Sequence, residues 1–542
     1  MVSLLPKPRP AVRAEHGVVA TSHPAAARVG REMLRAGGSA VDAAVAAAVA
    51  LTVVEPTSNG IGGDAFALVW DGTELHGYNG SGRAPGSLSA EAVCAGGHSA
   101  VPATGWASVT VPGQVRAWAD LHERFGRLPW HRLIEPAIDL AAQGCPVPPV
   151  VAHYWRRGVA AADRLTAPEC AAFLSTFAPQ GRAPQVGERV GLLGHARTLE
   201  RIAEHGAADF YTGEIARAIA EFAAQTHGFI TLEDLAQHRG DWVEPVTTAY
   251  QGFRLAEIPP NGQGIAALIA LGILDGLDLG EDLTDPAALH LQIEAMRLAF
   301  ADTFAHVGDP DHVAVPTSGL LDPGYLAGRR ELIGDLAADV VAGAPPRGGT
   351  VLLCAADEDG QMISLIQSNF HGFGSGVVVP GWGIALQNRA SGFVLDPGHP
   401  NELAPGRRPF HTIIPGFLFA DGQPLGPFGV MGGHMQAQGH VQVVLRTARG
   451  ADPQEALDAP RWRVEDGEVL LEPGLEGAAE GLSRRGHTVR VVEDGGFGRG
   501  QAIWRARGVG DGGVGGVGGG GVGGAAWIAG SETRCDGLAA AY

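Results

Sequence analysis

Helix and strand patterns are unevenly divided along this 542-residue sequence, and the division falls near Gly349-Thr350. Residues 351–356 and 362–366 have strand character and flank a turn at 357–360, which predicts a hairpin that begins at the threonine. The chain is expected to be an α+β protein whose last 193 residues (542 − 349) supply much of the sheet. Apolar periodicity predicts most helices earlier, over 22–35, 39–53, 113–124, 131–143, 194–204, 213–225, 264–275 and 286–306.

The Gly349-Thr350 junction is a candidate site of self-cleavage. The Thr350 hydroxyl can attack the Gly349 carbonyl, and an N→O shift followed by hydrolysis would free an α-amine on Thr350. That amine, with an unperturbed pKa of about 7.7 to 8.0, can take the hydroxyl proton near neutral pH. Thr350 would then be both nucleophile and base. The simpler alternative is a plain turn, because a chain with 81 glycines contains a Gly-Gly-Thr tripeptide by chance on the order of once.

Five further motifs favour the catalytic interpretation. They lie at 54–64 (VEPTSNGIGGD), 82–85 (GRAP), 373–376 (FGSG), 408–412 (RPFHT) and 431–433 (MGG). Their order and spacing resemble the γ-glutamyltransferase family from about Gly17 to Tyr542. The resemblance implies an N-terminal nucleophile hydrolase, in which a proenzyme cleaves itself into a large chain, 1–349, and a small chain, 350–542. Both chains would stay together in one four-layer αββα sandwich.

The resemblance also implies roles for four other residues. Ser368 lies where the family places a hydroxyl that hydrogen-bonds the nucleophilic threonine, whereas a serine at the end of a strand is the simpler alternative. Gly432 and Gly433 match the glycines whose backbone N–H groups stabilise the oxyanion. Arg83 matches an arginine that binds a substrate carboxylate, although it could equally be a solvated surface arginine.

Several positions depart from the family pattern. Where γ-glutamyl enzymes bind the glutamyl amine with Asn, Gln and Asp, this sequence has Phe370, Arg389 and Gly392. Arg389 would repel an ammonium group and attract an anion. His411 and Thr412 replace the paired serines that bind the carboxylate. This pattern is similar to the branch that contains oxamate amidohydrolase, and it implies a small carboxylate-bearing amide as substrate.

The expected function is a self-processing amidohydrolase that forms an acyl-enzyme and favours hydrolysis over transfer. Two alternatives remain. The first is an authentic γ-glutamyltransferase or glutathione hydrolase, which Arg83 supports and the lost amine ligands oppose. The second is a catalytically inactive binding member, which the presence of Thr350, Ser368 and the glycine pair opposes.

Composition excludes several other function classes. A formal charge of −19 with scattered basic residues argues against nucleic acid or an anionic membrane as a partner. Lys7 is the only lysine, so a Schiff-base lysine and a Walker phosphate loop are excluded. The histidines and five cysteines lack metal-type spacing, so neither a metal nor another cofactor is expected.

Location and oligomeric state are less constrained by the sequence. Residues 1–15 lack the apolar segment of a signal peptide and the cysteines are few and odd in number, so a cytoplasmic protein with reduced thiols is expected. A homo-oligomer is neither indicated nor excluded. The tract 508–524 is almost entirely Gly and Val, which predicts a flexible loop between strands that end near Arg505 and begin near Ala525.

Overall fold

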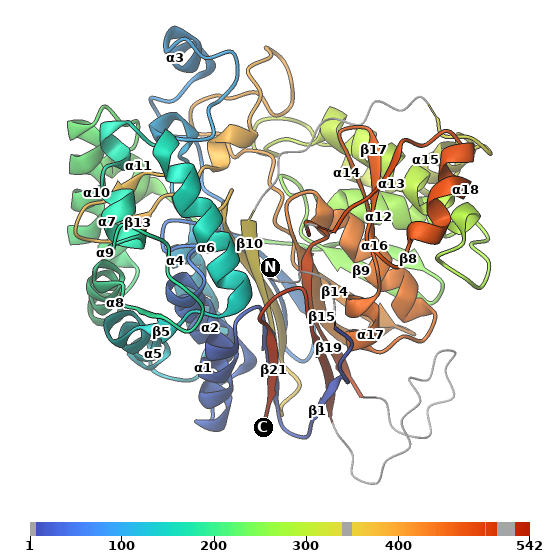
Figure 1. The fold of residues 1–542 in the computed structure, drawn as a ribbon, viewed down its shortest axis with the longest axis horizontal. Helices are drawn as coiled ribbons and strands as arrows, with labels where there is room; N and C mark the ends of the chain where they lie inside the picture. The colour runs from blue at the N-terminus through green and yellow to red at the C-terminus, as the bar shows by residue number, and fades with distance from the viewer. Residues whose placement is uncertain (1–6, 339–348, 494, 507–525) are drawn as a thin grey trace.

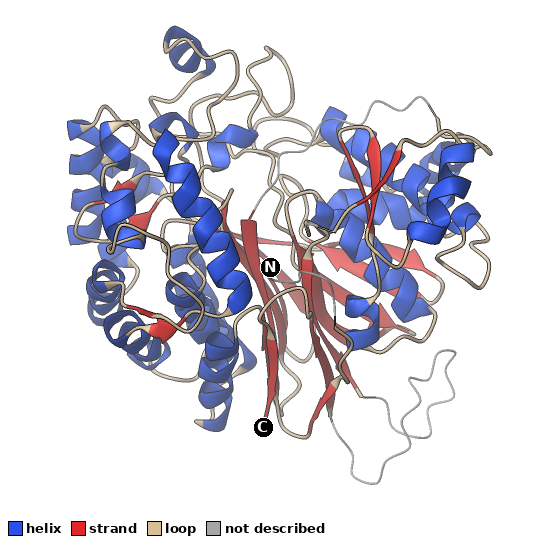
Figure 2. Cartoon of the chain, in the orientation of Figure 1, coloured by secondary structure: helices blue, strands red, loops and turns tan. Residues whose placement is uncertain are grey.

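Two β-sheets pack face to face, and helices cover the outer side of each sheet (Figures 1 and 2). The computed structural model describes residues 7–338, 349–493, 495–506 and 526–542. The four layers follow the order helix, sheet, sheet, helix, which is the αββα sandwich expected for this chain. Such an arrangement buries both faces of each sheet, so strand residues are apolar on both sides.

The first sheet carries the candidate nucleophile. Within the described residues its strand order is β21-β2-β10-β11-β3-β4-β7, and neighbouring strands are antiparallel. This sheet therefore contains strands from before and after the predicted cleavage point in the sequence. The strands are β2 (Val18–Thr21), β3 (Asp64–Trp70), β4 (Leu75–Asn79), β7 (Asp241–Val243), β10 (Gly349–Ala356), β11 (Met362–Phe370) and β21 (Leu538–Ala541).

The second sheet faces the first mainly through β15 and β19, which contact β10. Its order in the described part of the chain is β1-β20-β19-β15-β14-β9-β8. Both predicted chains contribute strands here as well. The strands are β1 (Val12–Ala14), β8 (Val246–Tyr250), β9 (Phe253–Glu257), β14 (Gly416–Ala420), β15 (Gln423–Met431), β19 (Arg499–Arg505) and β20 (Trp527–Ser531).

The outer helical layers separate to the left and right of the sheets in Figure 1. Over the first sheet lie α1 (Pro24–Arg35), α2 (Ala40–Val54), α4 (Gln114–Phe125), α5 (Trp130–Gln143), α6 (Pro149–Ala161), α8 (Leu193–His205) and α10 (Glu214–Gln225). Over the second lie α12 (Gly264–Leu274), α13 (Pro286–His306), α16 (Met435–Ala448) and α17 (Pro453–Asp458). Shorter helices are α3 (Ala90–Ala95), α7 (Ala172–Phe177), α9 (Ala208–Tyr211), α11 (Leu232–Gln237), α14 (Thr317–Leu320), α15 (Pro323–Arg330) and α18 (Ala479–Arg484). Small peripheral strands are β5 (Cys145–Pro146), β6 (Arg189–Val190), β12 (Val378–Val379), β13 (Ile384–Ala385), β16 (Trp462–Glu465), β17 (Glu468–Leu471) and β18 (Val489–Val491).

Helix α2 forms the centre of one helical layer, and its sequence explains why. Ser39 and Asp42 form the predicted capping box, in which each side chain accepts a hydrogen bond from the other residue's backbone N–H. Every residue of the helix is buried against β10, β11 and its neighbouring helices. Small Ala and Val side chains all around the helix permit this close approach, so it is a buried core helix, as expected.

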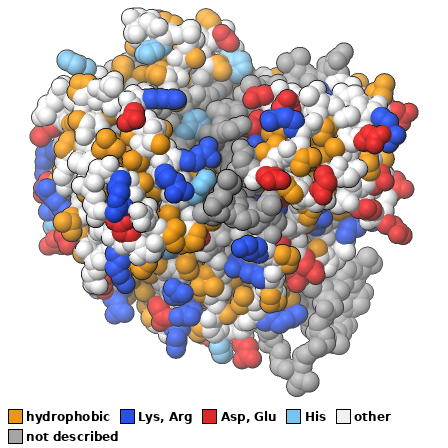
Figure 3. Space-filling view, in the orientation of Figure 1, with side chains coloured by type: hydrophobic (Ala, Val, Ile, Leu, Met, Phe, Trp, Pro, Cys, Tyr) orange, Lys and Arg blue, Asp and Glu red, His pale blue; other side chains and the backbone are white. Residues whose placement is uncertain are grey.

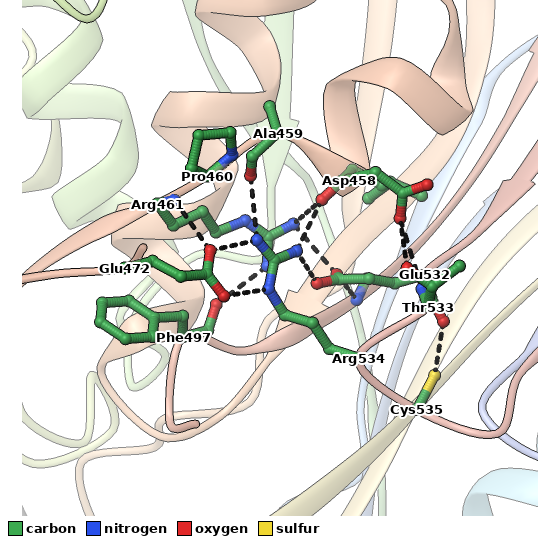
Figure 4. Close-up of polar contacts among 12 residues, drawn as sticks. Asp458, Ala459, Pro460, Arg461, Glu472, Phe497, Glu532, Thr533, Arg534 and Cys535 are labelled. Carbon is green, nitrogen blue, oxygen red and sulfur yellow. Dashed lines mark hydrogen bonds and ion pairs between the residues drawn. The ribbon is translucent and has the colours of Figure 1, made fainter. Parts of the chain in front are cut away.

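A buried ionic cluster ties the segment that follows β20 to the residue before β16 and the residue after β17 (Figure 4). Arg534 ion-pairs with both Glu472 and Glu532, and Arg461 ion-pairs with Glu532 at 3.0 Å. All four side chains are buried. Buried charges are tolerated only when they are paired and hydrogen-bonded, so this cluster depends on all its members.

Most predicted elements are confirmed, with small changes at their ends. The second hairpin strand, β11, extends four residues beyond 366, to Phe370. Sequence patterns gave no sign of α6 or α16. The tract 508–524 lies outside the described residues. All five cysteines are free thiols.

Charged side chains of both signs lie on the surface. Acidic and basic side chains are interspersed on the face shown in Figure 3, with acidic ones more frequent over the right-hand half. No helix in the described part of the chain is long and apolar enough to cross a bilayer.

Candidate active site

Thr350 is buried and lies at an irregularity in the pairing of β10 with β11. Gly349 pairs with Phe370 and Val351 pairs with Gln367, so the register shifts at the threonine. Between these pairs Thr350 is opposed by two residues of β11, Ser368 and Asn369, so the extra residue lies on β11, and a bulge of this kind redirects the side chains beside it. The Thr350 hydroxyl donates a hydrogen bond to Ser368 Oγ at 3.2 Å. The predicted contact between the threonine and Ser368 is therefore present.

Phe370 continues the site beyond Ser368. Its backbone N–H donates to Ser368 Oγ at 2.8 Å, and its φ of 77° lies in the left-handed region that residues with side chains rarely adopt. Such backbone strain is typical of functional sites. The Phe370 ring lies under the Arg389 guanidinium, with 4.0 Å between the guanidinium carbon and the ring centre. Arg389 is thereby connected to Thr350 through two residues, Phe370 and Ser368.

Arg389 is completely buried, and only part of its hydrogen-bonding capacity is used. Its Nη1 donates to Thr412 Oγ1 at 2.8 Å, whereas Nε and Nη2 have no partner among the described residues. Burial lowers the pKa of the guanidinium to about 9, and the nearby Asp64 carboxylate opposes that shift. The side chain is thus a cation at neutral pH, and two of its nitrogens, Nε and Nη2, have no hydrogen-bond partner among the described residues.

His411 and Asp64 form the other side of this buried cluster. His411 Nε2 lies 3.2 Å from Asp64 Oδ2, and both side chains are fully buried. Burial raises the pKa of Asp64 to about 6, although Arg389 and hydrogen bonds from Gln387, Gly113 and Gly82 lower it. Burial, together with Arg389, holds the pKa of His411 well below its usual value. At neutral pH the histidine is therefore uncharged and the carboxylate is ionised.

Gly432 and Gly433 form the turn between β15 and α16. Their φ angles of 133° and 60° are both in the region that favours glycine, so the turn needs residues without side chains. Gln263, which precedes α12, donates from Nε2 to the Gly433 carbonyl at 2.9 Å and to the Thr412 carbonyl at 2.5 Å. Its Oε1 lies 2.9 Å from His434 Nδ1. One buried glutamine therefore connects the glycine turn to the segment that binds Arg389.

Arg83 is not part of this cluster. Its guanidinium is partly exposed and ion-pairs with Asp311 at 2.8 Å, near Arg408 and Asp309. One buried nitrogen, Nη1, has no partner within the described residues. The role of Arg83 in carboxylate binding remains a prediction.

Sequence reasoning missed two residues of the site. Asp64 belongs to the motif at 54–64, which indicates the family but gives Asp64 no role. The side chain is 0% exposed, and this burial, which the sequence does not show, identifies it as part of the site. Gln263 is a single glutamine before a helix, and no local pattern distinguishes it from a surface residue. Its role is visible only in the folded chain, where it donates hydrogen bonds to residues about 150 to 170 positions away in the sequence.

A cavity of about 350 Å³ adjoins the glycine turn. Gly432 and His434 line it on one side, and Gly372 and Phe373, which follow β11, line it on another. Arg389 and Thr412 are not among its lining residues. The glycine turn thus borders the cavity through Gly432 and is linked through Gln263 to Thr412, which accepts a hydrogen bond from Arg389.

Known proteins share both the sequence and the fold. The chain is 35% identical to the glutathione hydrolase-like YwrD proenzyme of Bacillus subtilis, over 88% of this chain and 92% of that protein. It is 36% identical to the oxamate amidohydrolase proenzyme of Klebsiella pneumoniae, over 82% and 85% respectively. The crystal structure of cephalosporin acylase from Bacillus halodurans superposes with a TM-score of 0.92 and 49% identity, covering 99% of this chain and 98% of that one.

These matches confirm the resemblance and the α+β sandwich fold of N-terminal nucleophile hydrolases. The sequence model described as Gamma-glutamyltranspeptidase matches residues 26–542. The chain therefore belongs to the gamma-glutamyltranspeptidase family of hydrolase and transferase enzymes.

Proposed function

We propose that this protein is a self-cleaving N-terminal threonine amidohydrolase whose substrates are small amides that carry a carboxylate. The observation that carries the proposal is Arg389, a buried cation with two unpartnered nitrogens in the described structure. It is linked to Thr350 through Phe370 and Ser368. A buried charge without a partner costs several kcal/mol. A substrate carboxylate would supply that partner, whereas an ammonium group would be repelled.

The chemistry divides into maturation and turnover. In maturation, Thr350 Oγ attacks the Gly349 carbonyl, the peptide becomes an ester, and water releases the Gly349 carboxylate and the Thr350 amine. In turnover, that amine accepts the hydroxyl proton while Oγ attacks the substrate carbonyl. Backbone N–H groups at Gly432 and Gly433 would bind the resulting oxyanion. The C–N bond then breaks, the departing amine takes the proton, and water hydrolyses the acyl-enzyme.

An authentic γ-glutamyltransferase or glutathione hydrolase is the alternative function. Relatives named glutathione hydrolase proenzyme favour it, including one from Bacillus subtilis at 31% identity. A glutamyl donor would have to place its ammonium group near Phe370 and Arg389. Among the described residues the carboxylate near Arg389 is Asp64, which already interacts with His411. An inactive member is disfavoured by the intact contact between Thr350 and Ser368.

A substrate panel tests the proposal. We expect monoamides of small oxo-acids and dicarboxylates to have a higher kcat/KM than γ-glutamyl anilides and glutathione, with hydrolysis exceeding transfer to glycylglycine. Arg389→Gln should lower kcat/KM for the anionic amides by at least about 100-fold, since a charge-assisted hydrogen bond contributes about 1.5 to 3 kcal/mol and two are lost. Arg83→Gln is the matched comparison, and it should have the smaller effect. A clear preference for glutathione that Arg389→Gln leaves unchanged would establish the alternative.

A further inference from the structure

We propose that the cavity beside Gly432 binds the amine half of the substrate and selects amine halves that carry a carboxylate. The inference rests on the proposed function, because it assumes that the carbonyl of the amide lies at the glycine turn. Residues of both predicted chains line this cavity, which at about 350 Å³ is large enough for a small organic group. It is therefore a second recognition site next to the one that contains Arg389.

The position of the cavity identifies the half of the substrate that it would contain. Gly432 borders the cavity, whereas Arg389 and Thr412 lie outside its lining. If the acyl half extends from the glycine turn to Arg389, the group beyond the scissile C–N bond extends the other way. Phe373 and Met435 line the cavity together with Gly432, so a group that enters it from the glycine turn would contact them.

Among the described residues, more basic than acidic side chains line the cavity. Arg157, Arg463 and Arg499 line it, and the only lining carboxylate among the described residues is Glu465. Arg463 ion-pairs with Glu465 at 3.1 Å, and Arg499 ion-pairs with Glu55 at 3.2 Å.

Arg157 is the remaining cation. It is an exposed residue on α6, and it forms no ion pair or hydrogen bond with another described residue. It is therefore free to bind a carboxylate that enters the cavity.

The rest of the wall suits a ring or another apolar body. The Arg499 guanidinium lies 4.9 Å from the centre of the Tyr154 ring, and Phe373 and Met435 add apolar surface. His434 adds no charge, because burial, with Arg389 and His371, lowers its pKa to about 3. The ligand chemistry that fits is an amine with an apolar body and a terminal carboxylate. During turnover this amine would leave with the proton from the Thr350 amine, and water would complete the acid product.

Binding of two small amines to the processed enzyme tests the inference without any acyl group. Calorimetry would compare 4-aminobenzoate with aniline, which differ by the carboxylate. We expect 4-aminobenzoate to bind at least about 10-fold more tightly, corresponding to about 1.4 kcal/mol. Arg157→Gln should reduce that ratio to about 2 or less. Arg156→Gln is the matched control, because Arg156 is also exposed on α6 but does not line the cavity.

The possible outcomes are distinct. Equal binding of the two amines, or equal loss of the ratio in both α6 variants, would overturn the inference. A ratio lost in Arg389→Gln and kept in Arg157→Gln would also overturn it, because the carboxylate would then occupy the acyl side. If Arg157 controls the ratio but carboxylate-bearing amides are not hydrolysed, the cavity assignment stands and the proposed function fails.

Discussion

Gln263 donates a hydrogen bond to the Gly433 carbonyl at 2.9 Å, and this contact connects the predicted large chain to the glycine turn of the small chain. The same amide group donates to the Thr412 carbonyl, and Thr412 in turn accepts from Arg389. A single side chain therefore positions both the candidate oxyanion site and the candidate carboxylate site.

We predict that Gln263→Ala lowers kcat by about 10- to 100-fold with a smaller change in KM, because misplacing an oxyanion donor weakens binding of the transition state more than that of the substrate. Steady-state kinetics would measure both constants. Gln442→Ala is a matched control. Gln442, on α16, is also buried, and it donates to two backbone carbonyls, those of Gln438 and Trp462. An equal loss of kcat in the two variants would show that Gln263 has only a structural role.

Processing is predicted to depend on Thr350 and, to a lesser degree, on Ser368. The wild type should yield copurifying fragments of 349 and 193 residues (542 − 349), whereas Thr350→Ala should remain a single 542-residue chain. Thr350→Ser should still cleave. Ser368→Ala removes the 3.2 Å contact with the threonine hydroxyl and should slow cleavage. Denaturing electrophoresis with N-terminal sequencing would check each variant. An active wild type that is never cleaved would contradict this mechanism.

Local patterns were sufficient to predict much of the fold but only part of the site. The capping box at Ser39 and the hairpin after Thr350 depend on neighbours in sequence, and both are present. The left-handed backbone of Phe370 and the orphaned nitrogens of Arg389 depend on tertiary packing. Gln263 reaches its partners only after the chain has folded, so no spacing rule could identify it.

The ionic cluster in Figure 4 is predicted to be important for stability. Arg534→Met would leave Glu472 and Glu532 with fewer partners in a buried site, and breaking such a pair costs about 3 to 5 kcal/mol. Arg490→Met is the control, because Arg490 pairs with Glu468 at 3.0 Å on the surface, where a pair contributes about 0 to 1 kcal/mol. Urea unfolding would compare the midpoints. Similar midpoints for the two variants would show that the buried cluster is not needed.

The dependence of kcat/KM on pH is predicted to follow the charge of Arg389 in alkaline solution. Arg389, with a pKa of about 9, is a cation below that pH and loses its charge above it. His371 and His434, which also face Arg389, are neutral in this range because burial, with Arg389, lowers their pKa values to about 4 and 3. Asp64, with a pKa of about 6, is already ionised above pH 7. Deprotonation of Arg389 is thus the change expected to weaken carboxylate binding in alkaline solution.

For an anionic amide, kcat/KM should therefore rise as the Thr350 amine deprotonates, at about pH 7.7 to 8.0, and then fall above about 9. An amide without a carboxylate should show the rise but not the fall, since Arg389 has no anion to bind. In Arg389→Gln the fall should be absent for the anionic amide as well. Initial rates would be measured across this pH range at substrate concentrations well below KM, so that they report the ionisation of the free enzyme and the free substrate. If the same alkaline fall persists in Arg389→Gln, another group controls it, and Arg389 is not the residue that binds the substrate carboxylate.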